Sequence, residues 1–505
     1  MATKRTPRPK PKPSCTLRQF YLDDLPRTLF PLATNRVLVE RGLDDLVAFA
    51  ERLAKGGGSF LPQRRVHANK DHLHLRRTVK LDPVAEAFLY HLVHKNRSRF
   101  RKPHVPDRAH FGYRFEGGQP LMPSGSYAEF KLEVGLARIV YDEFVYFDVS
   151  TYFNNVYHHD LHAWFAALKP DDPADIVAFG KFFREINAGR SLDCLPQGLY
   201  PAKMIGNDFL RFIEASASIE APKILRFMDD VYLFGNDLNA LKADFAETQR
   251  LLGLKGLSVN GKKTLTGGTP LTDQADDSLG QLKTRLLKRR RHLIVSHYDD
   301  DPSSDNELSP PLGEEEVDFI VSVLAEGNLS EDDAELIMVV MRDHADRVQP
   351  HLPQFAVGFP HLAKNVFGLC REMNDKEAVA RVLLDVMSED PHVSEFQLFW
   401  FGMMLDDYLM DTSLAPNLIV ALTRHPGATD ITRAKVLEIA DHRYGLPEMR
   451  EVYLREGRSD WLAWASAVGS REMDKQARNY LLDYFKNGSE MNRLIAEIIQ
   501  KDKGH

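Results

Sequence analysis

The stretch that most constrains this chain runs from Lys223 to Gly235 and reads KILRFMDDVYLFG. Two adjacent carboxylates, Asp229 and Asp230, separate two short apolar runs that are rich in β-forming residues. The pattern predicts a β-hairpin with acids at its tip. Because two neighbouring like charges repel each other, we expect a cation beside them. Magnesium, which prefers carboxylate and phosphate oxygens together, fits that requirement.

A third carboxylate follows a second predicted strand. The segment from Tyr141 to Tyr152 reads YDEFVYFDVSTY, and its apolar run leads directly into Asp148. Two-metal nucleotidyl transfer needs carboxylates that converge from separate strands, because the ions activate the attacking hydroxyl and stabilise the leaving pyrophosphate. A surface turn that holds two acids is common, so this interpretation depends on Asp148 meeting Asp229 and Asp230 in space.

Four motifs in this chain resemble, in order, those of reverse transcriptases. They are FDVSTYF at Asp148, LPQGLYPAKMIGNDFL from Leu195 to Leu210, FMDD at Asp229 and Asp230, and LSVNGKKT from Leu257 to Thr264. Four motifs in the right order are far more specific than any one of them. The longer strings STYFNNVYHHDLHAWF and PQGLYPAKMIGNDFL are similar to those of bacterial defence-associated and abortive-infection reverse transcriptases.

The resemblance implies an α+β fold, in which a reverse-transcriptase-like palm and fingers precede an all-α helical-repeat domain. It implies a nucleotidyltransferase that uses two Mg²⁺ ions, which Mn²⁺ can replace, and Lys263 as a general acid. The implied metal ligands are Asp148, Val149, Asp229 and Asp230. The implied substrate-binding residues are Phe153 over the sugar, Gln197 and Gly198 at the base pair, and Arg76, Arg77, Lys80 and Arg114 around the triphosphate. Two plainer alternatives stay open: Phe153 is ordinary core, and the basic residues form a solvated helix face.

Composition limits the class of protein less sharply than the motifs do. The chain has 505 residues and a formal net charge of −7, so a basic surface for nucleic acid must be local. Three scattered cysteines favour a reducing compartment, and no apolar run reaches the length of a membrane span or a signal peptide. We therefore expect a cytoplasmic protein without membrane partners.

The predicted domains follow changes in composition. Residues 1–13 are basic, rich in proline and expected to be disordered; residues 14–298 form fingers and palm; residues 299–313 are an acidic, proline-containing linker; and residues 314–505 form an α-helical repeat domain. Within the second region, residues 76–101 read as one amphipathic helix with basic ends, and residues 282–294 as a basic helix beside nucleic acid. The MLDDY sequence at residues 404–408 is expected to be helical, with a capping or surface role.

Three functional hypotheses follow. The first is a template-independent DNA polymerase in antiphage defence, which adds dNTPs to its own hydroxyl and leaves single-stranded DNA attached to the protein. The candidate priming residues are Tyr408, Tyr444, Tyr453, Tyr480 and Tyr484. The alternative is an RNA-templated reverse transcriptase that uses a partner non-coding RNA. The third is a catalytically silent scaffold whose helical array binds a partner. For either enzyme we expect a homo-oligomer.

Overall fold

The computed structural model describes residues 14–101, 105–192, 195–267, 312–327 and 329–501. The chain divides into two compact units, one made of residues 1–24 and 88–269 and the other of residues 25–87 and 270–505. This division differs from the predicted domain boundaries, because residues 25–87 belong with the C-terminal helices. The predicted basic tail, the basic helix at residues 282–294 and residues 299–311 of the predicted linker lie outside the described residues.

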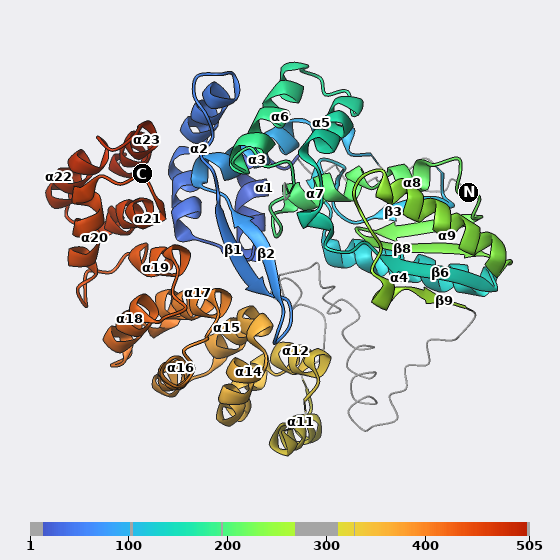
Figure 1. The fold of residues 1–505 in the computed structure, drawn as a ribbon. Coiled ribbons are helices and arrows are strands. Elements are labelled where there is room, and N and C mark those ends of the chain that lie inside the picture. The colour runs from blue at the N-terminus through green and yellow to red at the C-terminus, as the bar shows by residue number, and fades with distance from the viewer. Residues whose placement is uncertain (1–13, 102–104, 193–194, 268–311, 328, 502–505) are drawn as a thin grey trace, which may run out of the picture. The chain divides into compact units, whose positions relative to one another are not determined.

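The first unit is built around a five-stranded sheet with the strand order β3-β7-β8-β6-β9 (Figure 1). β3 and β7 run parallel, and the other neighbours are antiparallel. β7 and β8 form the predicted acid-tipped hairpin, which the structure confirms. The strand bounds are β3 Arg108–Phe111, β6 Glu143–Asp148, β7 Lys223–Phe227, β8 Asp230–Gly235 and β9 Leu265–Thr266.

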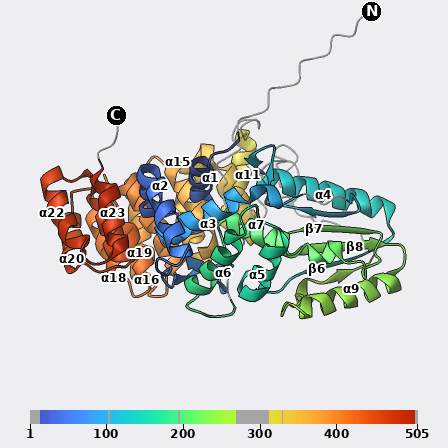
Figure 2. The same ribbon diagram turned by 90° about the horizontal axis from the view of Figure 1, so that it is seen from above.

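The sheet is covered on both faces, by α4 (Pro123–Val140) on one side and α9 (Leu238–Gly253) on the other (Figure 2). Phe130 of α4 packs on Phe227, with ring centroids 5.8 Å apart, and Phe245 of α9 packs on Phe147 at 5.2 Å. Because side chains alternate along a strand, Asp148 shares the face opposite Phe147. Asp148 and its register partner Asp230 therefore lie on the α4 face of the sheet.

The remaining elements of the first unit are mostly helices. Aromatic side chains hold α5 against α6, where the rings of Phe165 and Phe179 stack 4.2 Å apart. The bounds are α1 Leu17–Asp24, β4 Phe115–Glu116, β5 Gln119–Pro120, α5 His158–Ala167, α6 Ala174–Ile186, α7 Tyr200–Phe209 and α8 Phe212–Ala215, while α3 Pro83–Lys95 crosses the boundary between the units.

The second unit contains two stacked layers of helices, as the recurring proline breaks predict. α12, α15, α17, α19, α21 and α23 follow one another in one layer, and α14, α16 and α18 in the other, where α20 also packs on α22. No strand occurs within the described residues from 312 onward. The bounds are α11 Glu314–Glu326, α12 Glu331–Val340, α13 Ala345–Val348, α14 Leu352–Gly358, α15 Ala363–Glu372, α16 Lys376–Glu389, α17 Glu395–Met404, α18 Ala415–Arg424, α19 Asp430–Leu437, α20 Leu446–Glu456, α21 Trp461–Gly469, α22 Lys475–Phe485 and α23 Glu490–Gln500.

Residues 25–87 pack on these helices. They contain α2 (Ala33–Ala54) and a hairpin of β1 (Arg64–Asn69) and β2 (Leu75–Lys80). α2 contacts α21 and α23, and β1 contacts α17. The single helix predicted for residues 76–101 is therefore wrong at its N-terminal end, because Arg76, Arg77 and Lys80 lie in β2. Val66 and Ala68 alternate with more exposed residues along β1, a pattern typical of a half-buried strand.

A buried carboxylate fixes the start of α2 to the helical array. Glu438, fully buried after α19, accepts hydrogen bonds from the backbone N–H groups of Ala33 at 2.8 Å and Thr34 at 2.6 Å. The buried Lys435 ammonium lies 2.8 Å from the same carboxylate and 2.7 Å from Asp406. An acid at the first turn of a helix satisfies unpaired N–H groups and interacts favourably with the helix dipole. This cluster therefore joins residues that are some four hundred positions apart in sequence.

None of the described helices combines the length and apolar character that a bilayer-spanning segment requires.

Candidate active site

The tip of the β7–β8 hairpin is a tight turn made by Met228 and Asp229. Phe227 and Asp230 are paired in register on either side of it. Met228 is buried and adopts φ of +53°, in the left-handed region that a side chain disfavours. Strained backbone of this kind persists only where the surroundings hold it, and it is concentrated at functional sites.

The structure brings the third predicted acid to this tip. Asp148 ends β6 and is the register partner of Asp230 in β8, and the backbone N–H of Val149 donates to the carbonyl oxygen of Asp229 at 3.3 Å. Asp148 is buried, whereas Asp229 and Asp230 are partly exposed. The three carboxylates thus stand at one end of the sheet, and Asp148 and Asp230 lie on the same face of it.

Three polar side chains surround the acids. The Tyr146 hydroxyl donates to Asp230 Oδ1 at 2.6 Å. Asn260 Nδ2 donates to Asp148 Oδ2 at 3.2 Å, and the Lys263 Nζ lies 3.6 Å from the same oxygen. Lys263 is about half exposed, with a side-chain exposure of 52%. Its ammonium therefore neighbours the acids while remaining open to an incoming phosphate.

Tyrosines beside Asp230 are held in their protonated form. Burial, then the Asp230 charge, raises the pKa of Tyr127 to about 12. Burial and the hydrogen bond to Asp230 raise the pKa of Tyr146 further. Both hydroxyls therefore remain donors over the physiological pH range, and neither is a general base.

A buried ion pair, Arg226 with Glu214, is hydrogen-bonded to the strained turn. The Arg226 guanidinium, fully buried in β7, donates to the Met228 carbonyl oxygen at 2.8 Å and to the Glu214 carboxylate at 2.6 and 2.9 Å. His110 Nδ1 lies 2.8 Å from the same carboxylate. Burial opposes ionisation of Glu214, but the charge of Arg226 and the hydrogen bonds outweigh it and lower the pKa of Glu214 to about 2. Arg226 therefore holds the turn that presents Asp229.

Phe153 follows Asp148 closely and packs against α7. It is buried in a short 3₁₀ turn, Tyr152–Asn154, next to Thr151, which also has positive φ. Gly206 of α7 permits this contact, because a Cβ there would meet the Phe153 ring at 3.2 Å. The Tyr152 hydroxyl donates to the Gly206 carbonyl oxygen at 2.7 Å. The sequence therefore brings Phe153 and the PQG helix into contact.

Gln197 and Gly198 lie in the turn before α7. Gly198 has φ of +104°, a conformation that glycine adopts without steric penalty. The helix that follows is anchored at its start, where the Tyr200 N–H donates to Asp24 Oδ2 at 2.8 Å and Tyr90 donates to the same oxygen. The glycine in the predicted PQG motif is thus explained by the turn, and the role of Gln197 stays a prediction.

The predicted triphosphate contacts are placed less favourably. Arg114 is buried, and its guanidinium donates to Glu116 Oε1 at 2.6 and 2.8 Å, so a substrate contact would require that pair to separate. Lys80 is also buried and lies 2.9 Å from Glu86. Arg76 and Lys80 belong to the second unit, on β2. The roles of Arg76, Lys80 and Arg114 at a triphosphate stay predictions.

The donor set at the acids suits a hard cation. Among the described residues, no three His, Cys, Asp or Glu side chains converge closely enough to hold a metal ion by themselves. Mg²⁺ is commonly held by one or two carboxylates together with substrate phosphates. Asp148, Asp229 and Asp230 meet that need, with the remaining oxygens to come from a bound triphosphate. Val149 is buried, and only its backbone could contribute.

Three functional residues were missed from the sequence alone: Tyr146, Arg226 and Glu214. Arg226 had a signal, since a charged residue inside the apolar run KILRFM must find a buried partner. The sequence also holds a signal for Tyr146: it lies two residues before Asp148, so its side chain shares the strand face of Asp148. Glu214 lies in a short helix without a distinguishing pattern.

Comparisons with known proteins add little to this description of the site. No protein-family model matches the chain, and no curated protein does. Among solved structures it is similar to telomerase from Candida albicans in complex with a fragment of telomeric RNA, at 11% identity and a TM-score of 0.30. That match covers 72% of this chain and 62% of the telomerase chain. A likeness at this level does not define a shared fold, so the functional argument rests on the chain's own residues.

Proposed function

We propose that this chain is a DNA polymerase of the reverse transcriptase type that acts in antiphage defence and primes synthesis on its own hydroxyl. The observation that carries the proposal is the in-register pairing of Asp148 with Asp230 beside a strained turn that holds Asp229. Surface acid pairs are common, but two strand ends that oppose their carboxylates on one sheet face are not needed for stability. Like charges so placed destabilise the fold unless a cation joins them.

The proposed reaction is attack of a hydroxyl on the α-phosphate of a dNTP. The new P–O bond forms as the bond to the β-phosphate breaks, the proton of the attacking hydroxyl passes to bulk water, and pyrophosphate leaves. Magnesium, when bound, supplies charge stabilisation for the attacking and leaving oxygens. Asp148, Asp229 and Asp230 would hold the metal, and Lys263 gives a proton to the departing pyrophosphate. The Tyr146 hydroxyl holds Asp230 in position through its hydrogen bond.

The test is incubation of the purified protein with labelled dNTPs and Mg²⁺ but no added nucleic acid. A protein-primed enzyme gives a labelled band that migrates with the protein and is sensitive to DNase. An RNA-templated enzyme instead gives free product that disappears after RNase treatment of the preparation. If no labelled DNA forms with any mixture of dNTPs, either attached to the protein or free, the polymerase proposal fails. Protection of cells against phage, lost in the same variants that lose synthesis, tests the defence role.

The candidate priming tyrosines differ in exposure and in the surroundings of their hydroxyls. Burial raises the pKa of Tyr408 far above its usual value, and its hydroxyl donates to the Phe367 carbonyl oxygen at 3.0 Å. Tyr480 is 52% exposed, and hydrogen bonds from Tyr484 and Arg455 lower its pKa. Tyr480 is also the most exposed of the five candidate tyrosines, so its hydroxyl is the most accessible for attack on a phosphate.

We expect Tyr480→Phe to remove the labelled protein band while elongation of an added primer continues. Its hydroxyl is the nucleophile in this proposal, and its ring contacts survive in phenylalanine. Tyr484→Phe is the matched control, since it deletes the neighbouring hydroxyl 3.0 Å away and the hydrogen bond, but not the nucleophile. A protein band of unchanged intensity in Tyr480→Phe would exclude this residue as primer and leave the polymerase itself untouched.

We expect Phe153→Ala to admit ribonucleotides. In the proposed site the ring blocks a 2′-hydroxyl, so its removal should raise the rNTP-to-dNTP incorporation ratio roughly ten- to a hundred-fold. The ratio is measured with single labelled nucleotides on a primed template. Gly206→Ala is a useful companion, since its methyl group would press on the Phe153 ring without removing it. If the ratio does not change in Phe153→Ala while dNTP incorporation persists, Phe153 is core only.

A further inference from the structure

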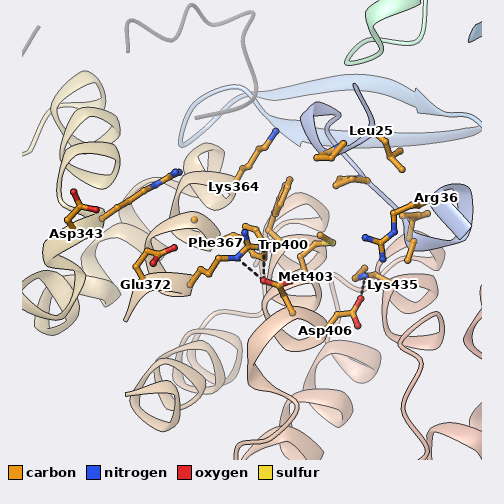
Figure 3. Close-up of a pocket in the computed structure, with 18 residues that line it drawn as sticks. Leu25, Arg36, Asp343, Lys364, Phe367, Glu372, Trp400, Met403, Asp406 and Lys435 are labelled. Carbon is orange, nitrogen blue, oxygen red and sulfur yellow. Dashed lines mark hydrogen bonds and ion pairs between the residues drawn. The ribbon is translucent and has the colours of Figure 1, made fainter. Parts of the chain in front are cut away.

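A cavity of about 600 Å³ in the second unit surrounds Trp400 and is lined by parts of α2, α15, α17 and α19 (Figure 3). Five basic and four acidic side chains line it, and they pair across the wall: Asp406 lies 2.7 Å from Lys435, and Asp407 lies 2.6 Å from Arg371. The helix predicted for MLDDY is confirmed, but its two acids line this cavity instead of capping a helix. Acids and bases in such balance favour neither an anion nor a cation.

A cavity of about 460 Å³ in the first unit has a very different charge. Its volume is in the range of small-molecule binding sites. It lies between the segment that follows α3, strand β3, the end of α5, and α8. Five of its ten described lining residues are basic, and the only acid among the ten is Glu214. The basic residues are Arg99, Arg101, Arg108, Lys169 and Arg211.

Two of the five basic residues have a carboxylate partner. Arg99 pairs with Asp171, and Arg211 Nη1 lies 3.4 Å from an Asp208 carboxylate oxygen. The carboxylate of Glu214 is already held in the buried ion pair beside the catalytic turn, so it offsets none of the five. Each of these three acids is thus matched before the remaining cations are considered.

The other three basic residues have no carboxylate partner within the described part of the chain. The Arg108 guanidinium donates to the backbone carbonyl oxygens of Ser216 at 3.0 Å and Ile219 at 2.5 Å. Arg101 Nε donates to the carbonyl oxygen three residues before it at 3.3 Å. The Lys169 ammonium makes no hydrogen bond or ion pair with a described residue. Carbonyl oxygens are neutral acceptors, so all three positive charges remain in the wall.

Lys169 stands in strained backbone just after the end of α5. Its φ is +55°, in the left-handed region where glycine or asparagine usually ends a helix. A cation at a helix C-terminus interacts favourably with the dipole, which is a plainer account of this lysine. That dipole amounts to about half an elementary charge, less than the charge of one ammonium. It also explains neither Arg101 nor Arg108, which reach the cavity from other segments.

The three unmatched side chains suit the oxygens of a phosphate group. Arg101 and Lys169 are exposed and Arg108 is half-buried, so all three remain open to a ligand. An arginine fork matches two phosphate oxygens, and a lysine adds a compact charge. No aromatic side chain occurs among the described lining residues, so a nucleobase would find no ring to stack on. The wall is therefore chemically suited to phosphates rather than to bases.

We propose that this cavity binds a multiply charged phosphate group, with Arg101, Arg108 and Lys169 as its cations. A terminal phosphate carries about two negative charges, so it offsets the three cations better than a singly charged carboxylate or phosphodiester does. Two sources share this chemistry: a free compound such as pyrophosphate, and the phosphorylated end of a nucleic-acid strand. The cavity contains none of the palm acids, and the proposal does not depend on polymerase activity.

The test is calorimetric titration of the full chain with pyrophosphate, in EDTA so that no metal joins the ligand to the palm acids. Two further titrations use a labelled dT oligonucleotide with and without a 5′-phosphate, followed by fluorescence anisotropy. Binding of pyrophosphate without preference for the phosphorylated strand identifies a free compound as the source. Tighter binding of the phosphorylated strand than of the unphosphorylated one identifies a strand end. Either result supports the site.

Variants of the exposed cations connect this binding to the cavity. Lys169→Ala and Arg101→Ala should each weaken binding roughly ten-fold, the effect of losing one charge-assisted contact, and Lys169→Arg should restore most of it. Lys242→Ala is the matched control, because it removes the same charge from an exposed position of α9 in the same unit, away from the cavity. Thermal melting checks that each variant is folded.

The palm variant separates this proposal from the proposed polymerase. Asp229→Asn with Asp230→Asn should retain phosphate binding, because neither residue lines the cavity. The proposal is overturned if none of the three ligands binds at millimolar concentration, or if Lys169→Ala and Arg101→Ala bind as tightly as Lys242→Ala. Loss of binding in the palm variant alone would also overturn it, since the ligand would then lie at the palm.

Discussion

Replacing Asp229 and Asp230 together by asparagine is expected to abolish nucleotide incorporation. Each substitution keeps the side-chain volume and removes the charge that would hold a divalent cation. Metal stabilisation of a phosphoryl transition state contributes several kcal/mol, so we expect a loss of roughly a thousand-fold or more in rate. The measurement is incorporation of labelled dNTP per minute at saturating Mg²⁺.

The folded state should tolerate this change or gain from it. Relief of repulsion between the two carboxylates gives a melting temperature that is unchanged or slightly higher. Asp406→Asn is an unsuitable control because Asp406 is paired with buried Lys435, whereas Asp237→Asn lies just beyond β8 at an exposed helix cap and suits the purpose. Incorporation at the original rate in the double variant would rule out the proposed site and revive the scaffold hypothesis.

The second large effect is expected from Arg226→Ala. Truncation leaves the Glu214 carboxylate buried without its partner and removes the donor to the Met228 carbonyl oxygen. Breaking a buried ion pair in this way costs about 3–5 kcal/mol. A shift of the hairpin tip by about 1 Å would further lower the rate about a hundred-fold. Denaturant unfolding and the dNTP assay measure the two effects separately.

The pH dependence of stability should change as well. The pKa of Glu214 is lowered to about 2 in the folded state from an ordinary value near 4.5. Its ionisation therefore stabilises the fold above about pH 4.5, and this contribution is lost as pH falls towards 2. In Arg226→Ala, the free energy of unfolding should therefore depend less on pH over this acid range. Arg250→Ala, which breaks an exposed pair with Glu247 2.6 Å away, should leave stability almost unchanged, because solvent screens such a pair.

The sequence predicts the hairpin and the placement of its acids well, for local reasons. The apolar runs on either side of Asp229 and Asp230 are too short for helices, and the two acids mark the turn between them. The short apolar run before Asp148 likewise predicts a strand. Because side chains alternate along a strand, every second residue of this run is expected on the same face as Asp148. The fold class as a mixed α+β chain with a helical C-terminal region could be derived in this way.

The sequence predicts poorly whatever depends on distant partners. RRTVK at residues 76–80 is compatible with a helix or a strand, and its partner strand at residues 64–69 decides the outcome. The burial of Lys80 and Arg114 follows from Glu86 and Glu116, neither of which is distinctive in the sequence. The cavity around Trp400 requires α2, α15, α17 and α19 together, so no single segment indicates it.

The attachment of residues 25–87 to the helical array has a consequence for biosynthesis. Glu438 and Lys435 are translated some four hundred residues after the first turn of α2, yet that turn needs them. Until they have left the ribosome, the early hairpin and helix must wait with apolar surface uncovered, a state that recruits chaperones. A gene shortened after the palm would leave that waiting state permanent, so its product should precipitate rather than yield a minimal enzyme.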